Sequence, residues 1–199
     1  MTTWNDFLSD VHLEIQRLAS IGCDIPFFRG HEDSTWQLMP SLGRRPKKRH
    51  KNDNIESILY YDFLSYAGPL MKNRSSSWDI LFAMQHHGLP TRLLDWSETF
   101  AVALYFALKN YLPTKKNPTK IQKFPDPAIW ILDPFELNNG TGGERVLFNP
   151  ETDFDTNYQE VFIEEKGKLE GKVIALIPTK TIQRLVVQKG VFTLHQDIS

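Results

Sequence analysis

The chain contains a single cysteine, Cys23, among 199 residues. One cysteine excludes an intrachain disulfide framework and a cysteine-based zinc site, which fits a reducing compartment. For Cys23 itself, a small buried side chain is a commoner role than a catalytic nucleophile. The opening MTTWNDFLSDVHLEI lacks the basic and apolar regions of a signal peptide, and no apolar run approaches the roughly 20 residues that span a bilayer. We therefore expect a cytoplasmic protein without a membrane partner.

The chain also lacks an excess of charge of either sign. Its 23 Lys and Arg are balanced by 24 Asp and Glu, for a formal net charge of −1. The whole chain thus gives no electrostatic argument for binding nucleic acid or anionic membrane. Walker A, HExxH and GxSxG motifs are absent, and LNNGTGGE at 137–144 has neither the spacing nor the flanking strand and helix of a dinucleotide fingerprint. With 41% hydrophobic and 12% aromatic residues, the composition indicates one folded globular domain.

The hydrophobic pattern predicts an α+β fold, with helices first and strands later. A helix over 3–19 is capped by Thr3, carries Asp6 in its first turn and is ended by Gly22. We expect further helices over 55–72 and 78–85 and a third starting at Ser97, whose faces are nearly all apolar, as in a buried core helix. The expected strands are 25–30, which ends at Gly30, and those in 128–133, 144–149, 172–178 and 184–194. The prediction is an N-terminal helix in 1–25 and one domain over 26–199, with basic loops at 43–54 and 113–127.

The segment QHHGLPTRLLDWS at 85–97 places many polar side chains beside an apolar stretch. Gly88 and Pro90 end the preceding helix. A helix beginning at Ser97 would present free N–H groups and partial positive charge to the loop before it. The loop side chains predicted to gather there, at a phosphate or carboxylate site, are His86, His87, Thr91, Arg92 and Asp95.

The same segment also has a structural interpretation. Arg92 could serve as a bidentate anion fork, or it could pair with Asp95 and fix the loop. We expect Asp95 to be structural, because its carboxylate can accept backbone N–H groups or hold Arg92. Trp96 is expected to fill the core. In IPFFRG, Arg29 is the one charge on a strand built for burial, so we expect it to line a pocket; the alternative is an ion pair with Asp24, Glu32 or Asp33.

An ordered set of motifs resembles the FRG domain family from about Pro26 to His195. The motifs are FFRG at 27–30, WQLMPSLGR at 36–44, QHHGLPTRLLDWS, ALYFAL at 103–108 and QKGVFTLH at 188–195. The family recurs in bacteria and phages, so the resemblance implies a role in defence or conflict.

FFRG is also similar to the aromatic-Arg-Gly at the strand end that begins the site of Arg-Ser-Glu ADP-ribosyltransferases, and ALYFA, with Tyr105, is similar to a segment of their diphtheria-like branch. This resemblance implies a mainly antiparallel split β-sheet, NAD as substrate and no metal. Arg29 would grip the phosphates, with Phe28 and Gly30 beside the ligand and His87 or Thr91 on a ribose.

The late acidic residue of those transferases has two candidates here. Glu144, in GERVLFNP, lies one residue from the expected place, which Arg145 occupies; Gln188, in QKGVF, can hydrogen-bond a hydroxyl but carries no charge. An acid at this point would stabilise the oxocarbenium-like transition state.

Three classes of function remain open. The first is an enzyme that acts on NAD or a related nucleotide. The second is a nuclease or hydrolase with His86 or His87 as general base, with basic loops at 44–51 and 115–123 holding a phosphate backbone. The third is a non-catalytic module that binds a nucleotide or a partner protein. The macromolecular target, if there is one, is protein or nucleic acid.

Overall fold

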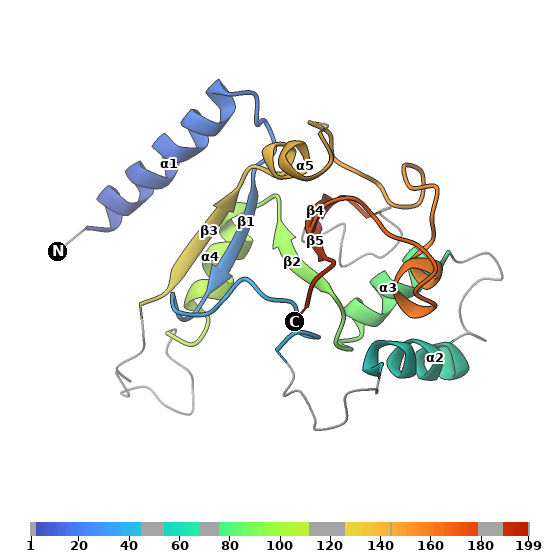
Figure 1. The fold of residues 1–199 in the computed structure, drawn as a ribbon. Helices are drawn as coiled ribbons and strands as arrows, with labels where there is room; N and C mark the ends of the chain where they lie inside the picture. The colour runs from blue at the N-terminus through green and yellow to red at the C-terminus, as the bar shows by residue number, and fades with distance from the viewer. Residues whose placement is uncertain are drawn as a thin grey trace.

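A computed structural model of the chain describes residues 3–44, 54–67, 76–111, 126–143, 145–178 and 189–198. It contains a five-stranded sheet in the order β3-β1-β2-β5-β4, in which all neighbouring strands are antiparallel (Figure 1). The strands are β1 Phe27–His31, β2 Leu93–Ser97, β3 Ala128–Leu132, β4 Val173–Leu176 and β5 Gly190–His195. The α+β class and the antiparallel sheet predicted from the sequence are therefore confirmed.

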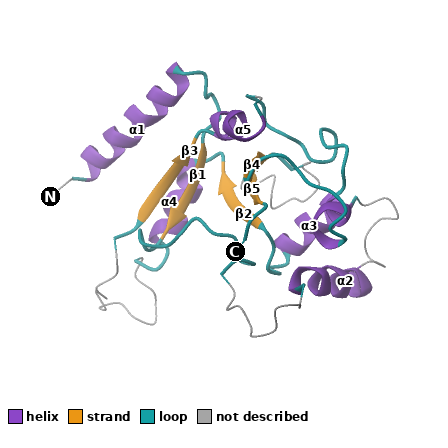
Figure 2. Ribbon diagram, in the orientation of Figure 1, coloured by secondary structure: helices purple, strands orange, loops and turns teal. Residues whose placement is uncertain are grey.

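The helices lie around this sheet (Figure 2). They are α1 Trp4–Ser20, α2 Ile55–Ala67, α3 Ser77–His86, α4 Phe100–Leu108 and α5 Pro134–Gly142, with a π-helical segment, η2, at Gln159–Ile163. α4 packs against β1, α5 against β4, and α2 against α3 and η2. α1 extends along the outer, β3 side of the sheet. Among the described residues, none of these helices combines the length and apolar content needed to cross a membrane.

Local sequence signals explain where the first helices start. α1 begins with a capping box, in which Thr3 and Asp6 satisfy each other's backbone N–H groups, and the chain then leaves the helix through Gly22 at φ +85°. α3 begins with a second capping box, formed by Ser76 and Asp79. The predicted helices at 3–19 and 78–85 are thus confirmed to within a few residues.

The alternation of side chains in β2 and β5 divides the core between the two faces of the sheet. Leu93 and Phe192 belong to a cluster with Trp78 and Leu81 of α3. Their neighbours Leu94 and Val191 point the other way, as the two-residue period of a strand requires, and join a second cluster. That cluster contains Phe27, Leu94, Trp96, Ala175 and Val191. Cys23 is also buried, with 1% of its surface exposed, and burial raises the pKa of its thiol to about 11, which fits a packing role.

The sheet is divided between β1 and β2. These strands pair at one residue pair, Phe28 with Ser97, whereas β1 pairs with β3 at five and β2 with β5 at five. The strands β1 and β2 diverge on leaving this point (Figure 1). The expected split sheet is therefore present, and the split leaves room for a cleft.

The sequence prediction failed around residue 97. LLDWS forms strand β2, and α4 starts only at Phe100, with Thr99 as N-cap, so no helix begins at Ser97. α4 is also not buried all round, because only Ala103 and Ala107 are buried and Tyr105 is 56% exposed. Ser97 and Thr99 are both N-cap residue types, and the helix uses the second of them. Of the predicted strand at 144–149, the described part contributes an isolated bridge between Phe148 and Leu176. Residues 68–72 and 184–188 lie outside the described residues.

Candidate functional site

A cleft of about 430 Å³ lies beside the junction of β1 and β2. β1 contributes Phe28 to His31, α3 one wall, and α4 another. Its charged side chains and histidines are more often basic than acidic; they are Arg29, His31, Glu32, Arg44, His86, Asp95 and Lys109. Its large apolar side chains are aromatic; they are Phe28, Trp36, Phe82, Trp96, Phe106 and Phe192.

Arg29 spans the split in the sheet. Its Nη1 donates to the main-chain carbonyl of Asp95 on β2, at 2.5 Å, and its Nε donates to Nε2 of His31, at 2.9 Å. Among the described residues no carboxylate lies within ion-pair distance of Arg29, so the pairs considered with Asp24, Glu32 or Asp33 do not form. Burial lowers the pKa of the guanidinium, and the negative charge of Asp95 opposes this shift. Arg29 thus lines the cleft, as predicted, as a half-buried cation without a carboxylate partner.

His31 lies two residues after Arg29 in the same strand, on the same face, and is 3% exposed. Its Nε2 faces Arg29, and its Nδ1 faces the indole N–H of Trp130 on β3, at 3.2 Å. Burial and then the charge of Arg29 lower the pKa of His31, against a smaller opposing contribution from a hydrogen bond with the Trp36 backbone. The ring is therefore neutral at neutral pH.

Asp95 lies on the cleft floor with its carboxylate exposed. Buried Thr91 donates to Oε1 of Gln85 at 2.5 Å, and Nε2 of Gln85 donates to Asp95 at 2.8 Å, so a short chain of hydrogen bonds fixes the carboxylate. Asp95 has neither of the partners predicted for it, Arg92 or the backbone N–H groups of a helix start, because β2 replaces the expected helix; its structural role stays a prediction. Thr91 is 1% exposed and does not line the cleft, so its predicted contact with a ligand is wrong.

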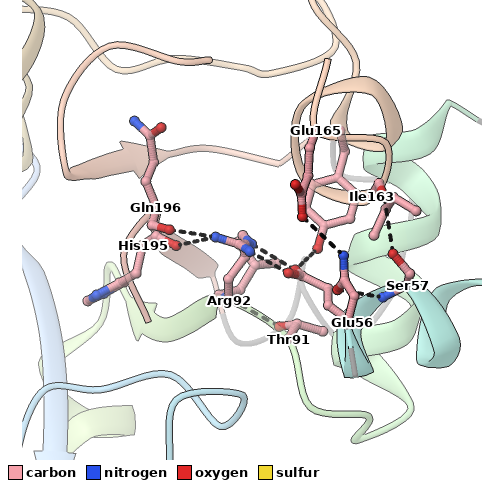
Figure 3. A network of polar contacts seen from close by, with 11 residues as sticks. Glu56, Ser57, Thr91, Arg92, Ile163, Glu165, His195 and Gln196 are labelled. Carbon is pink, nitrogen blue, oxygen red and sulfur yellow. Dashed lines mark hydrogen bonds and ion pairs between the residues drawn. The ribbon is translucent and has the colours of Figure 1, made fainter. Parts of the chain in front are cut away.

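Arg92 is part of a buried network away from the cleft (Figure 3). Its Nε and Nη2 donate to the two oxygens of Glu56, and its Nη1 donates to the carbonyls of His195 and Gln196, at 3.1 and 2.8 Å. Tyr158 also donates to Glu56. Burial lowers the pKa of Arg92, but the contacts with Glu56 raise it, and the net shift is upward. The predicted use of Arg92 as an anion fork for a ligand is wrong, because its donors bind the protein itself.

The two adjacent histidines separate at the end of α3. His86 lines the cleft, whereas His87 is the exposed C-cap of the helix, packs on Phe63 and does not line the cleft. Successive helical residues point about 100° apart, so only one of them enters. Tyr105 on α4 also lies outside the lining, which contradicts its predicted contact with a ligand.

The remaining predicted residues either line the cleft or lie outside the described residues. Phe28 lines the cleft, and Trp96 combines a cleft position with a buried hydrogen bond from its Nε1 to Thr193, as expected of a core residue. Glu144 and Gln188, the candidates for the late acid, lie outside the described residues, as do most of the basic loops at 43–54 and 113–127. No group of three metal-binding side chains gathers in the described ranges.

Gly30 has a packing role that the sequence did not reveal. A Cβ on this residue would lie 1.8 Å from the carbonyl oxygen of Ala103 and 2.7 Å from the backbone nitrogen of Ala107. The glycine lets α4 lie directly on β1, backbone against backbone, and so sets the position of the wall that α4 adds to the cleft. It also lines the cleft.

Sequence reasoning missed several lining residues. His31 directly follows FFRG, while Trp36 and Arg44 are the two ends of WQLMPSLGR, so the recognised motifs already pointed to them. Lys109 carried no such signal; it follows directly after α4, lines the cleft and forms an ion pair with Glu32 at 3.2 Å.

These features define an α+β protein with a split antiparallel sheet and a basic, aromatic cleft at the split. Residues 25–116 match the model of the FRG domain family, so an FRG domain is present in this part of the chain, as the motifs from FFRG to ALYFAL predicted; the predicted extension to His195 lies outside the match. The matched part includes β1, α3, β2 and α4, which supply most of the cleft. Comparisons with curated proteins and with solved structures gave no match.

Proposed function

We propose that the cleft binds a nucleotide-type ligand, with Arg29 on its phosphates and aromatic side chains on its base. The observation that carries the proposal is the state of Arg29: a half-buried guanidinium that contacts a carbonyl and a neutral ring instead of a carboxylate. Removing a charge from water is costly unless it is paired, so this site favours an anionic ligand. Arg44 supplies a second cation in the same cleft.

The aromatic lining of the cleft supports the proposal that the ligand carries a base. Trp36 is 49% exposed, and Phe106 on α4 also lines the cleft. Planar rings of this kind suit the flat face of a base, and stacking on an aromatic side chain contributes about 1–3 kcal/mol per base. A ligand with both a base and phosphates uses both parts of the lining.

NAD is the nucleotide that we propose as substrate, in an ADP-ribosyltransferase-like reaction. The bond between nicotinamide and its ribose would break, nicotinamide would leave with the bonding electrons, and water or a target side chain would form the new bond to the ribose carbon. Asp95 is the cleft carboxylate without an ion pair among the described residues, since Glu32 binds Lys109. We therefore add Asp95 to Glu144 and Gln188 as a candidate to stabilise the positive charge that develops on the ribose.

Titration with ADP and with NAD, followed by calorimetry, tests the binding step. We expect both to bind the wild type and Arg29→Gln to weaken binding about tenfold or more, because it removes hydrogen bonds to a charged group. Arg17→Gln, on the exposed face of α1, is the matched control and should bind like the wild type. Absence of ADP and NAD binding to the wild type would overturn the nucleotide proposal.

A time course of nicotinamide release tests the chemical step. It is run with NAD alone and with protein, RNA and DNA as acceptors. Binding of NAD without release of nicotinamide would favour the non-catalytic binding module. Cleavage of RNA or DNA without NAD would favour the nuclease, for which His86 is the histidine in the cleft. A role in bacterial or phage conflict predicts that expression in a bacterial host lowers its NAD pool, and that Arg29→Gln prevents this.

A further inference from the structure

The ring of His31 receives more hydrogen-bond donors than it can accept. Arg29 points its Nε–H at Nε2, and Trp130 points its indole N–H at Nδ1. An arginine in a protein keeps its proton, and the indole nitrogen is a donor only. A neutral imidazole has one acceptor nitrogen, and an imidazolium has none. Whichever tautomer is present, one of the two donors meets an N–H.

The two donors differ in whether they have another hydrogen-bond partner besides His31. Among the described residues, the indole N–H of Trp130 has no partner other than His31. Arg29 retains its bond to the Asp95 carbonyl, and its Nη2, on the same edge as Nε, has no partner within the described ranges. The Trp36 backbone, which opposes the lowered pKa of His31, acts as an acceptor for a ring N–H and therefore does not relieve the excess of donors. The arrangement therefore favours a ring that accepts from Trp130 at Nδ1 and carries its proton on Nε2, which leaves Nε of Arg29 in need of another acceptor.

We propose that Arg29 and His31 together form a subsite for a phosphate-type oxyanion, with Trp130 holding His31 in the Nε2–H tautomer. The anion accepts from Nε and Nη2 of Arg29, which is the bidentate geometry that a guanidinium offers to phosphate. Nε2–H of His31 then becomes a third donor to the same anion, which takes the place of the present contact between Nε2 and Nε of Arg29. Both residues line the cleft, so the anion reaches them from there. The inference rests on the proposed phosphate contact of Arg29 and adds two residues, His31 as ligand contact and Trp130 as positioning residue.

Nitrogen NMR of the histidine ring reads the tautomer directly. The wild-type chain, labelled with ¹⁵N-histidine, is titrated with inorganic pyrophosphate at pH 7.5, and the His31 signals are assigned with the His31→Asn variant. We expect the bound protein to show a protonated Nε2 and an unprotonated Nδ1. An Nδ1–H ring in the bound state would overturn the proposal, and this result needs no variant that might fold poorly.

Trp130→Phe tests the positioning role by affinity. Without the indole N–H, the ring is free to adopt the Nδ1–H tautomer and to compete with the anion for Arg29. Pyrophosphate and ADP should then bind about three- to tenfold more weakly, as expected for one neutral hydrogen bond. Trp4→Phe, on exposed α1 outside the cleft lining, should bind like the wild type. Equal affinities of Trp130→Phe and wild type would contradict the role of Trp130.

The outcomes separate this subsite from the proposed function. If ADP binds the wild type while His31 is in the Nδ1–H form, the nucleotide function stands and the subsite fails. If pyrophosphate binds and selects the Nε2–H form while ADP does not bind, the subsite stands and the nucleotide function fails. If neither ligand binds, both are overturned.

Discussion

Gly30 and Ala103 contact each other through their backbones: a Cβ built on Gly30 would lie 1.8 Å from the carbonyl oxygen of Ala103. Neither atom belongs to a flexible side chain, so the clash can be relieved only by moving α4 away from β1. Gly30→Ala should therefore lower the free energy of unfolding by at least about 1–3 kcal/mol, the usual cost of overpacking. Urea denaturation measures this. In Gly140→Ala, at an exposed position of α5 where a Cβ would have no neighbour within 4 Å, we expect no loss of stability. Equal stability of the two variants would contradict the packing role of Gly30.

The buried pair of Glu56 and Arg92 should contribute to stability and not to ligand binding. Glu56→Gln leaves the Arg92 guanidinium buried beside a neutral group, which we expect to cost about 3–5 kcal/mol in the free energy of unfolding. Replacing both residues by Met should cost less than the sum of the single changes, because no unpaired charge remains. Glu14→Gln, in the exposed pair with Arg17, is the control and should leave the unfolding midpoint unchanged. A loss of ADP affinity in the folded double variant would show that Arg92 contributes to ligand binding.

His195 should make the protein less stable in mild acid. Burial, and then the charges of Arg29 and Arg92, lower its pKa from 6.5 to about 4. Between these two values the unfolded chain binds a proton that the folded chain does not, so stability falls as the pH drops through this window, by about 1–2 kcal/mol once screening by solvent is allowed for. His195→Gln should remove this part of the acid sensitivity. The measurement is urea denaturation at pH 7 and pH 4.5, with the exposed His12→Gln as control; the same pH dependence in wild type and His195→Gln would contradict the assignment.

Asp95→Asn removes the negative charge from the cleft floor and keeps the size and shape of the side chain. The amide can keep the hydrogen bond with Gln85, so we expect a stability change below about 1 kcal/mol. Removing a negative charge near Arg29 should tighten pyrophosphate binding about two- to fivefold. If NAD is cleaved with Asp95 as the stabilising acid, the same change should slow nicotinamide release about 100-fold. Asp24→Asn, exposed and outside the cleft, is the control. Weaker pyrophosphate binding in Asp95→Asn would show that the carboxylate does not oppose the anion.

The sequence predicted the fold where local signals were strong. It predicted the parts of the site that short motifs carry. Thr3 and Asp6 indicated the start of α1, and Arg29 was identified as the one charge on an apolar strand. By contrast, Ser97 and Thr99, which follow the strand residues, are both suited to cap a helix, and the local pattern could not tell which of them marks the boundary between β2 and α4. The error at Ser97 then misplaced Asp95 and Arg92, whose environments depend on pairing with β5 and on Glu56, 36 residues earlier in the chain. Such long-range partners leave no trace in a local pattern.

The bond from Arg29 to Asp95 ends on a main-chain carbonyl. Because every residue type presents the same carbonyl, the hold on the guanidinium does not depend on which side chain occupies position 95. Mutation at this position can therefore alter the charge that a ligand meets while the arginine stays in place. For protein engineering, position 95 is a point at which ligand preference can be varied separately from the architecture of the cleft, provided that β2 keeps its register with β5.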